Sequence, residues 1–137
     1  MKKAIRAIVI ILVASLCAVS CKKFLQTVAI AGEWQVVRIV ETVDGKDPLD
    51  TPELNNYDIF YKFETNGYFI KTRQSRLGLS SHEDGTWFVD GDTLLLRFVD
   101  GTETYHLERT SLLELVFSYS EILDGHKYTY TYTLKHI

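Results

Sequence analysis

The sequence lacks an excess of positive charge. Its 137 residues carry 15 Lys and Arg against 18 Asp and Glu. Because the first 20 residues hold Lys2, Lys3 and Arg6 and no acid, the rest of the chain has 12 basic against 18 acidic residues, a formal charge of −6. A net-acidic chain without a basic stripe argues against nucleic acid as the main partner. The length is that of a single domain.

Cysteine and proline are also scarce. The two cysteines, Cys17 and Cys21, exclude a disulfide-rich scaffold. Both prolines, Pro48 and Pro52, lie in the acidic stretch 44–56, which we interpret as a long loop. Beyond the amino terminus, no window repeats apolar residues with the 3.6-residue period of a helix. A hydrophobic content of 46% nevertheless suffices for a folded core, so the core is expected to be built from strands.

Motifs of catalysis and metal binding are missing. The four histidines are not spaced as metal ligands, and there is no glycine-rich phosphate loop and no Gly-x-Ser-x-Gly elbow. The best metal candidate, His82-Glu83-Asp84, is interpreted as a solvated loop before a hairpin. Asp90-Gly91-Asp92 lacks the further ligands of a calcium loop and is interpreted as a turn. We therefore expect no enzymatic activity, no metal and no cofactor.

The first 20 residues predict a signal peptide. A basic segment, 1–6, precedes the apolar run 7–14, which is shorter than the roughly 20 residues that span a bilayer. Ala18-Val19-Ser20-Cys21 resembles the lipobox of bacterial lipoproteins, which implies cleavage before Cys21 and lipidation of its thiol. Several acyl chains would give stable membrane anchoring. An ordinary signal-peptidase site fits the same residues, and in that case the protein is simply secreted.

Six of the eight glycines follow Asp or Asn, a pair typical of β-hairpin turns. The runs between these pairs are rich in aromatic and β-branched residues. The pattern predicts eight strands, at about 33–41, 57–64, 68–75, 86–90, 93–99, 102–108, 112–119 and 127–135. In the last strand Tyr128, Tyr130 and Tyr132 share one face, and the intervening threonines share the other.

Eight short antiparallel strands joined in sequence form a meander whose edges must be hidden. Closure into a barrel removes the edges and leaves an interior that is filled by side chains or holds one small ligand. We therefore expect an all-β protein, an eight-stranded antiparallel up-and-down barrel over 32–137. The signal peptide 1–20 and a tether, 21–31, precede it. A flat or sandwich arrangement of the same strands is the alternative.

Short motifs within 32–137 support a family resemblance. Gly32-Glu33-Trp34 resembles the Gly-x-Trp at the start of lipocalin and fatty-acid-binding-like barrels, where the Trp closes the barrel floor. The hairpin 63–69 and the block 85–96, which reads Gly-x-Trp-x-apolar-x-Gly-Asp-x-Leu-x-Leu, resemble the small lipocalin-like lipoproteins of Bacteroidetes. The resemblance implies a lipocalin-like barrel in the cell envelope, anchored at the outer membrane and facing the periplasm. It implies no activity, and the chain lacks the Thr-Asp-Tyr motif and C-terminal helix of true lipocalins.

Large aromatic residues occupy the faces that we assign to the interior: Trp34, Tyr61, Phe63, Trp87, Phe98, Tyr105, Phe117, Tyr128, Tyr130 and Tyr132. These rings either fill the core or line a pocket in which tyrosine hydroxyls contact a ligand. The candidate ligand-binding residues are Trp34, Tyr61, Trp87, Tyr105, Tyr128, Tyr130 and Tyr132. If the last strand pairs with the first, we expect the tyrosine row beside Trp34 and Val36. Arg38 and Arg73 point inward or outward according to the register.

Two functions are compatible with these features. The first is a non-enzymatic, membrane-anchored, lipocalin-like lipoprotein that binds a small apolar or amphipathic molecule in the barrel. The second is a protein-interaction module with a filled core, such as a protease inhibitor or an accessory subunit of an envelope complex. Its contacts would come from the loops 44–56 and 73–82. The sequence leaves the ligand, the membrane leaflet and the oligomeric state open.

Overall fold

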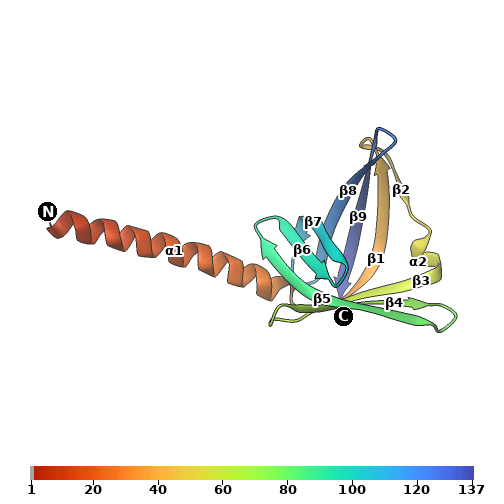
Figure 1. Ribbon diagram of the computed structural model, residues 1–137, viewed down its shortest axis with the longest axis horizontal. Helices are drawn as coiled ribbons and strands as arrows, with labels where there is room; N and C mark the ends of the chain where they lie inside the picture. Colours follow the sequence, from red (N-terminus) through yellow and green to blue (C-terminus); the bar gives the residue numbers. More distant parts are fainter. Residues whose placement is uncertain (1) are drawn as a thin grey trace.

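A long N-terminal helix leads into an antiparallel β-barrel (Figure 1). The structure is a computed structural model that describes residues 2–137, except for the side chains of residues 2, 3, 16–20 and 23. Helix α1 (Lys2–Ile30) projects away from the barrel. The expected tether 21–31 is helical up to Ile30, and the side chains of the lipobox residues 18–20 lie outside the described residues. Among the described residues, no helix combines the length and the apolar character needed to cross a bilayer.

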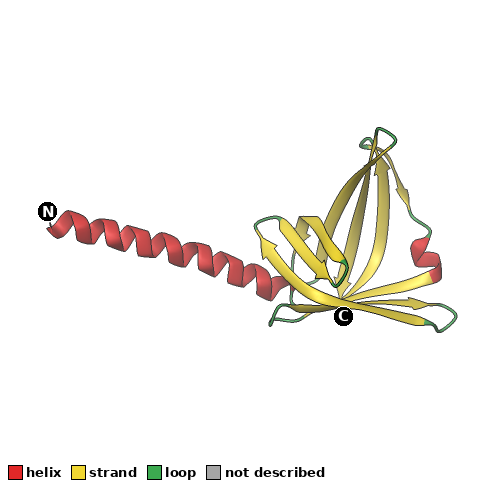
Figure 2. Cartoon of the chain, viewed as in Figure 1, coloured by secondary structure: helices red, strands yellow, loops and turns green. Residues whose placement is uncertain are grey.

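Nine strands follow in the described part of the chain (Figure 2). They are β1 (Gly32–Val43), β2 (Lys46–Asp50), β3 (Tyr57–Phe63), β4 (Tyr68–Ser75), β5 (Ser80–Asp90), β6 (Thr93–Phe98), β7 (Gly101–Thr110), β8 (Glu114–Leu123) and β9 (His126–His136). Except for β2, each strand pairs with the next in an antiparallel meander, and β9 pairs with β1. The predicted eight-stranded up-and-down barrel is therefore confirmed, with β2 added at the edge of β1.

The prediction of a loop over 44–56 is wrong, because this segment contains β2 and a short helix, α2 (Glu53–Asn56). The edge of β1 is shared, since β3 pairs with its first residues, 32–35, and β2 with its last, 40–43. β2 has no other neighbour in the sheet. An edge strand tolerates Pro48, which has no N–H to donate.

The strand predicted at 86–90 begins earlier, at Ser80, so Asp84-Gly85 lies within β5 and not in a turn. Gly85 is required by a close approach of two strands, because a Cβ at this position would lie 1.8 Å from the backbone oxygen of Arg97. The predicted loop 73–82 shrinks to 76–79. His82-Glu83-Asp84 consequently belongs to a strand paired with β4, which corrects its interpretation as a loop.

Two Asp-Gly pairs form the turns expected of them. Asp44-Gly45 has φ angles of 50° and 71°, and Asp124-Gly125 has φ angles of 50° and 79°. Positive φ at both positions is the requirement of a type I′ hairpin turn. The Asp44 carboxylate joins the two turns, since it accepts a hydrogen bond from the Lys127 backbone N–H at 2.9 Å and lies 2.8 Å from His126 Nδ1.

The core fills one end of the barrel. We call this end the floor; it comprises the end of α1 and the β3–β4, β5–β6 and β7–β8 turns. The largest fully buried side chains are Trp34, Tyr61, Phe63, Phe69, Phe117, Ile30, Leu94, Leu96, Leu115 and Leu134. We call the opposite end, with the β1–β2, β4–β5 and β8–β9 turns and the segment 51–56, the mouth.

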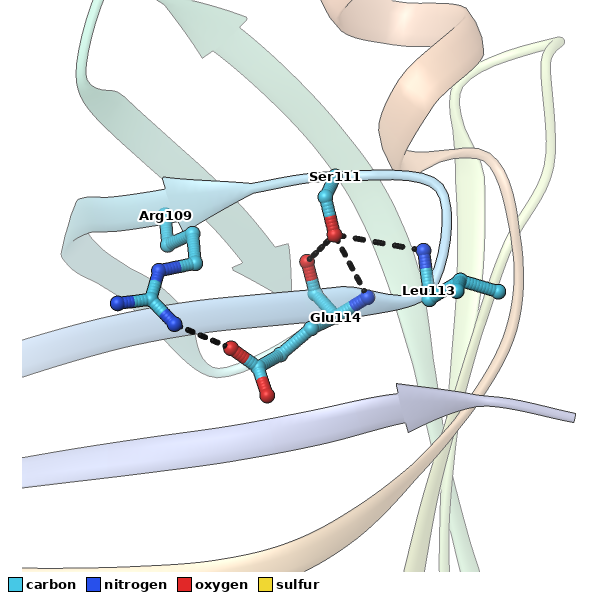
Figure 3. A network of polar contacts seen from close by, with 4 residues as sticks. All are labelled: Arg109, Ser111, Leu113 and Glu114. Carbon is cyan, nitrogen blue, oxygen red and sulfur yellow. Dashed lines mark hydrogen bonds and ion pairs between the residues drawn. The ribbon is translucent and has the colours of Figure 1, made fainter.

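The β7–β8 turn at the floor is fixed by Ser111 (Figure 3). Its hydroxyl donates to the Glu114 backbone oxygen at 3.1 Å and accepts hydrogen bonds from the backbone N–H groups of Leu113 and Glu114. Arg109 donates to the Glu114 carboxylate at 2.7 Å. Because Ser111 bonds three turn groups locally, this turn needs no glycine.

Candidate functional site

Two adjoining cavities lie at the mouth. The larger measures about 430 Å³, and its wall includes Tyr119, Tyr130 and Tyr132 together with the segment 49–53. The second measures about 260 Å³ and shares Tyr119 and Tyr132 with the first. It adds Tyr105 and charged side chains of β4 and β7. Tyrosines of β8 and β9 therefore form the common wall of both cavities.

The tyrosine rings continue the packing of the core. Tyr119 stacks on Tyr130 with centroids 5.1 Å apart and on Tyr132 with centroids 6.2 Å apart. Tyr132 in turn stacks on Phe117, which is fully buried, at 5.6 Å. Tyr105 meets Tyr119 edge to face at 5.6 Å. The rings are thus held in place from the floor side, while those nearest the mouth are half-buried.

The register of β9 corrects the expected position of the tyrosine row. Because β1 and β9 are antiparallel, Trp34 lies opposite His136 and not beside the tyrosines. Tyr132 and Tyr130 pair instead with Ile39 and Glu41 near the end of β1. The predicted alternation along β9 is confirmed, but the tyrosine row lies at the mouth and not at the floor.

The predicted site residues divide between the two ends. Trp34, Tyr61 and Trp87 are buried in the floor core, with exposed fractions of 0%, 1% and 6%. The indole N–H of Trp34 donates to the Ile30 carbonyl, and that of Trp87 donates to the Glu64 carbonyl, both at 2.8 Å.

Tyr105, Tyr130 and Tyr132 line the mouth cavities. Tyr128 is half-buried on the same strand but lies outside the lining of both cavities. Cys21 is an exposed free cysteine on α1. The structure therefore brings three of the predicted tyrosines together and places both tryptophans elsewhere.

The two ambiguous arginines have different orientations. A bulge in β1 between Val36 and Arg38 turns Arg38 to the outside, where its guanidinium donates to Asp50 at 2.7 Å. Arg73 lies on the inner face of β4 and pairs with Glu53 at 3.1 Å. Its guanidinium also lies 3.7 Å from the centroid of the Tyr57 ring. Arg73 therefore faces the mouth with its charge paired, and its Nε is buried without a hydrogen-bond partner among the described residues.

Burial changes the ionisation of the tyrosines. Loss of hydration raises the pKa of Tyr105 and Tyr132 well above the ordinary tyrosine value. Desolvation and the neighbouring Glu41 carboxylate raise the pKa of Tyr130 to about 12. The Tyr105 hydroxyl donates to the Glu103 carboxylate. All three phenols are neutral near pH 7 and present aromatic rings and hydroxyl groups to the cavities.

Several lining residues were missed by sequence reasoning. Tyr119 alternates with Leu115 and Phe117 in the predicted strand 112–119, so period-two alternation was sufficient to find it. Glu41 faces the cavity only because of the bulge in β1, and Glu53 belongs to the segment interpreted as a loop. In the described side chains, no group of three or more His, Cys, Asp or Glu is arranged to hold a metal ion.

Comparison with known proteins identifies relatives of this barrel. The family model of the lipocalin-like domain matches residues 30–117. A lipocalin-like protein from Bacteroides uniformis is similar in structure, with a TM-score of 0.56 and 15% identity over 80% of this chain and 99% of that chain.

Two further solved structures are similar. A protein from Bacteroides eggerthii has a TM-score of 0.53 and 13% identity, covering 78% of this chain and 98% of that chain. Lobster apocrustacyanin A1 has a TM-score of 0.53 and 10% identity, covering 86% of this chain and 66% of that chain. A search of curated proteins finds no match. At these identities the structural likeness concerns the fold.

Proposed function

Since the chain belongs to the lipocalin-like domain family, we propose that it is a non-enzymatic protein that binds a small apolar or amphipathic molecule at the mouth of the barrel. One observation carries this proposal: the floor is packed, whereas tyrosines at the mouth border a cavity of about 430 Å³. Ligand pockets commonly measure about 300–1,000 Å³ and are lined by aromatic rings with a few polar groups. On this proposal, the core interpretation of the aromatic residues applies to the floor and the pocket interpretation to the mouth.

Native mass spectrometry tests ligand binding. The delipidated protein, purified from its own envelope, is expected to carry a small molecule that organic solvent releases. Tyr119→Leu removes one of the two rings shared by both cavities and is expected to abolish this retention. Tyr68→Leu is the matched control, because Tyr68 is 58% exposed outside these cavities. A wild-type protein without any bound molecule, or equal retention by Tyr119→Leu, argues against the proposal.

The proposal includes a lipid anchor at Cys21 and an outer-membrane location facing the periplasm. The lipobox-like residues 18–21 and the exposed thiol of Cys21 support the anchor. The location is proposed from the resemblance to lipocalin-like lipoproteins of Bacteroidetes alone. Incorporation of an alkyne-labelled fatty acid in cells tests the anchor. The label is expected to be lost in Cys21→Ser and kept in Cys17→Ser, and a Cys21→Ser protein that still takes up label rules the anchor out.

A protein-interaction module is the second candidate function. Apolar side chains at the mouth support it, since Leu77 and Leu79 in the β4–β5 turn are 91% and 75% exposed. Exposed apolar groups that cluster on a turn favour a protein contact over a solvated loop. Crosslinking in cells is expected to join the chain to one stoichiometric partner, and Leu77→Ser with Leu79→Ser is expected to abolish the product. A product that is unchanged in this variant speaks against the module.

A further inference from the structure

The side chains that face the mouth carry more negative than positive charge. Strand alternation places Glu41, Glu83, Glu103 and Glu121 on inner faces, and α2 adds Glu53. The lysine and arginine on these inner faces are Lys71 and Arg73. Arg76 in the β4–β5 turn adds a third positive charge to the mouth, and it donates to the Leu54 carbonyl at 3.2 Å. Lys71 and Arg73 each already have a carboxylate neighbour, Glu83 at 3.8 Å and Glu53 at 3.1 Å. The mouth therefore retains an excess of carboxylate after its internal pairs are counted.

Glu41 is the acid best placed to act on a ligand. It lies in the wall of the larger cavity and pairs across the strands with Tyr130. Among the described residues, no Lys, Arg or His nitrogen lies within 4.0 Å of its carboxylate. The other acids of this wall, Asp50 and Glu53, are paired with arginines. A carboxylate that is partly removed from water and lacks a counter-ion attracts a cation.

Thr51 provides an independent observation in the same wall. Its hydroxyl oxygen is buried and has no hydrogen-bond partner among the described residues. Buried polar atoms without partners are rare, because each costs free energy. An N–H donor placed in the cavity beside Thr51 would satisfy this oxygen.

The tyrosine rings suit a cation as well. The faces of tyrosine rings attract ammonium and guanidinium groups. The described part of this barrel already contains two such contacts, one between Arg73 and the Tyr57 ring at 3.7 Å and one between Lys71 and the Tyr61 ring at 5.8 Å. Tyr119, Tyr130 and Tyr132 offer rings of the same kind beside Glu41.

We infer that the larger mouth cavity binds an organic cation, a protonated amine carried on an apolar or aromatic body. The ammonium group lies at Glu41 and Thr51, and the apolar body packs on the tyrosine rings. This inference rests on the proposed function and narrows its ligand to one class. A carboxylate ligand is disfavoured at this position, because it would face Glu41, and the charges of Arg38 and Arg73 are paired with Asp50 and Glu53. The Nε of Arg73 is buried without a hydrogen-bond partner among the described residues, so an anionic probe is included in the test.

Three probes of one size and different charge test the inference. They are 2-phenylethylamine, 2-phenylethanol and phenylacetate, which are cationic, neutral and anionic at pH 7. Binding to the full chain is followed by the NMR signals of the tyrosine rings. The amine is expected to bind roughly tenfold more tightly than the alcohol, with the anion weakest. High salt is expected to weaken the binding of the amine alone, because salt screens the attraction between its charge and the carboxylate.

Glu41→Gln removes the charge and keeps the shape. It is expected to lower the affinity for the amine roughly tenfold and to leave the affinity for the alcohol unchanged. Glu33→Gln is the matched control on the same strand, since Glu33 pairs with Lys62 at 3.3 Å outside these cavities. It is expected to bind all three probes as the wild-type chain does.

The outcomes separate this inference from the proposed function. Three results would reject the organic cation as ligand but keep the proposal that the barrel binds a small molecule. They are equal binding of the three probes, tighter binding of phenylacetate, and an amine preference that survives both high salt and Glu41→Gln. If no probe binds and no molecule co-purifies with the chain, both proposals fail. Because the salt series needs no variant, the test holds even if Glu41→Gln does not fold.

Discussion

The floor and the mouth of this barrel are built by the same strands but differ in how their polar groups are satisfied. At the floor, the indole N–H groups of Trp34 and Trp87 donate to backbone carbonyls, so large rings are buried without unpaired atoms. At the mouth, Tyr130 and Tyr132 are half-buried among carboxylates. β9 illustrates the contrast, since Leu134 at its floor end is fully buried. Stability is therefore expected to depend on the floor, and ligand recognition on the mouth.

Removing Trp34 is the strongest test of this division. Trp34→Ala is expected to lower the free energy of unfolding by about 3–5 kcal/mol, the range for deleting a large buried aromatic. The cause is a cavity at a position with no exposed surface, beneath the end of α1. Urea denaturation followed by far-UV circular dichroism measures it. Tyr128→Ala at the mouth is the control and is expected to lower the free energy of unfolding far less. Equal losses in the two variants would contradict the division between floor and mouth.

Gly85 offers a second test, from added volume. Gly85→Ala places a Cβ 1.8 Å from the Arg97 backbone oxygen and 3.0 Å from the Phe69 ring, so β5 and β6 must separate. We expect the free energy of unfolding to fall by about 1–3 kcal/mol, the usual cost of overpacking. Gly101→Ala is the control, because its Cβ meets no atom within 4 Å. Thermal denaturation of both variants checks this, and a Gly85→Ala protein as stable as Gly101→Ala would show that the strands are not in close contact.

Much of the barrel was predictable because its signals are local. Asp44-Gly45 and Asp124-Gly125 have the backbone angles that Asp-Gly hairpin turns require. The alternation of Tyr128, Tyr130 and Tyr132 placed the three rings on one face. Turn chemistry and period-two alternation depend on neighbouring residues, so a single sequence is sufficient to find them.

The remaining features depend on partners distant in the sequence. The bulge beside Arg38 arises from pairing with β9, and it sets the faces of both Arg38 and Glu41. Asp84-Gly85 has the sequence of a turn, but its strand continues because β4 and β6 hold it on both sides. The acidic wall of the mouth could not be predicted for the same reason, since α2 and β1 bring its members together only in the fold.

A smaller contrast is expected between two tyrosine hydroxyls. Tyr105→Phe removes the hydroxyl that donates to Glu103 from a side chain only 5% exposed. It is expected to cost about 0.5–1.5 kcal/mol, the net value of one hydrogen bond. Tyr130→Phe removes a hydroxyl that bonds Glu41 nearer the mouth, where water can replace the bond, and its stability is expected to stay within about 0.5 kcal/mol of wild type. Urea denaturation compares the two, and a larger loss in Tyr130→Phe would place its hydroxyl among the groups that stabilise the fold.

The smallest expected effect is an acid-dependent loosening of the mouth alone. Hydrogen bonds from His126 and from the Lys127 backbone lower the pKa of Asp44 below its ordinary value of 3.8. A carboxyl with a lowered folded pKa stabilises the protein above its unfolded pKa, and this stabilisation is lost as the pH falls through the folded value. The link between the β1–β2 and β8–β9 turns is therefore expected to break below pH 3.8. The Lys127 amide signal, followed by NMR, reports the transition.

Asp44→Asn and Asp124→Asn separate this link from the turns themselves. Both aspartates occupy the first position of a type I′ turn with a φ of 50°, which Asn also tolerates. Asp44→Asn is expected to abolish the transition at Lys127, and Asp124→Asn to preserve it. The chain has two tryptophans, Trp34 and Trp87, and both lie at the floor, so their fluorescence is expected to stay constant while the mouth loosens. If fluorescence changes together with the Lys127 signal, the two ends unfold as one unit, and the mouth has no independent freedom with which to admit a ligand.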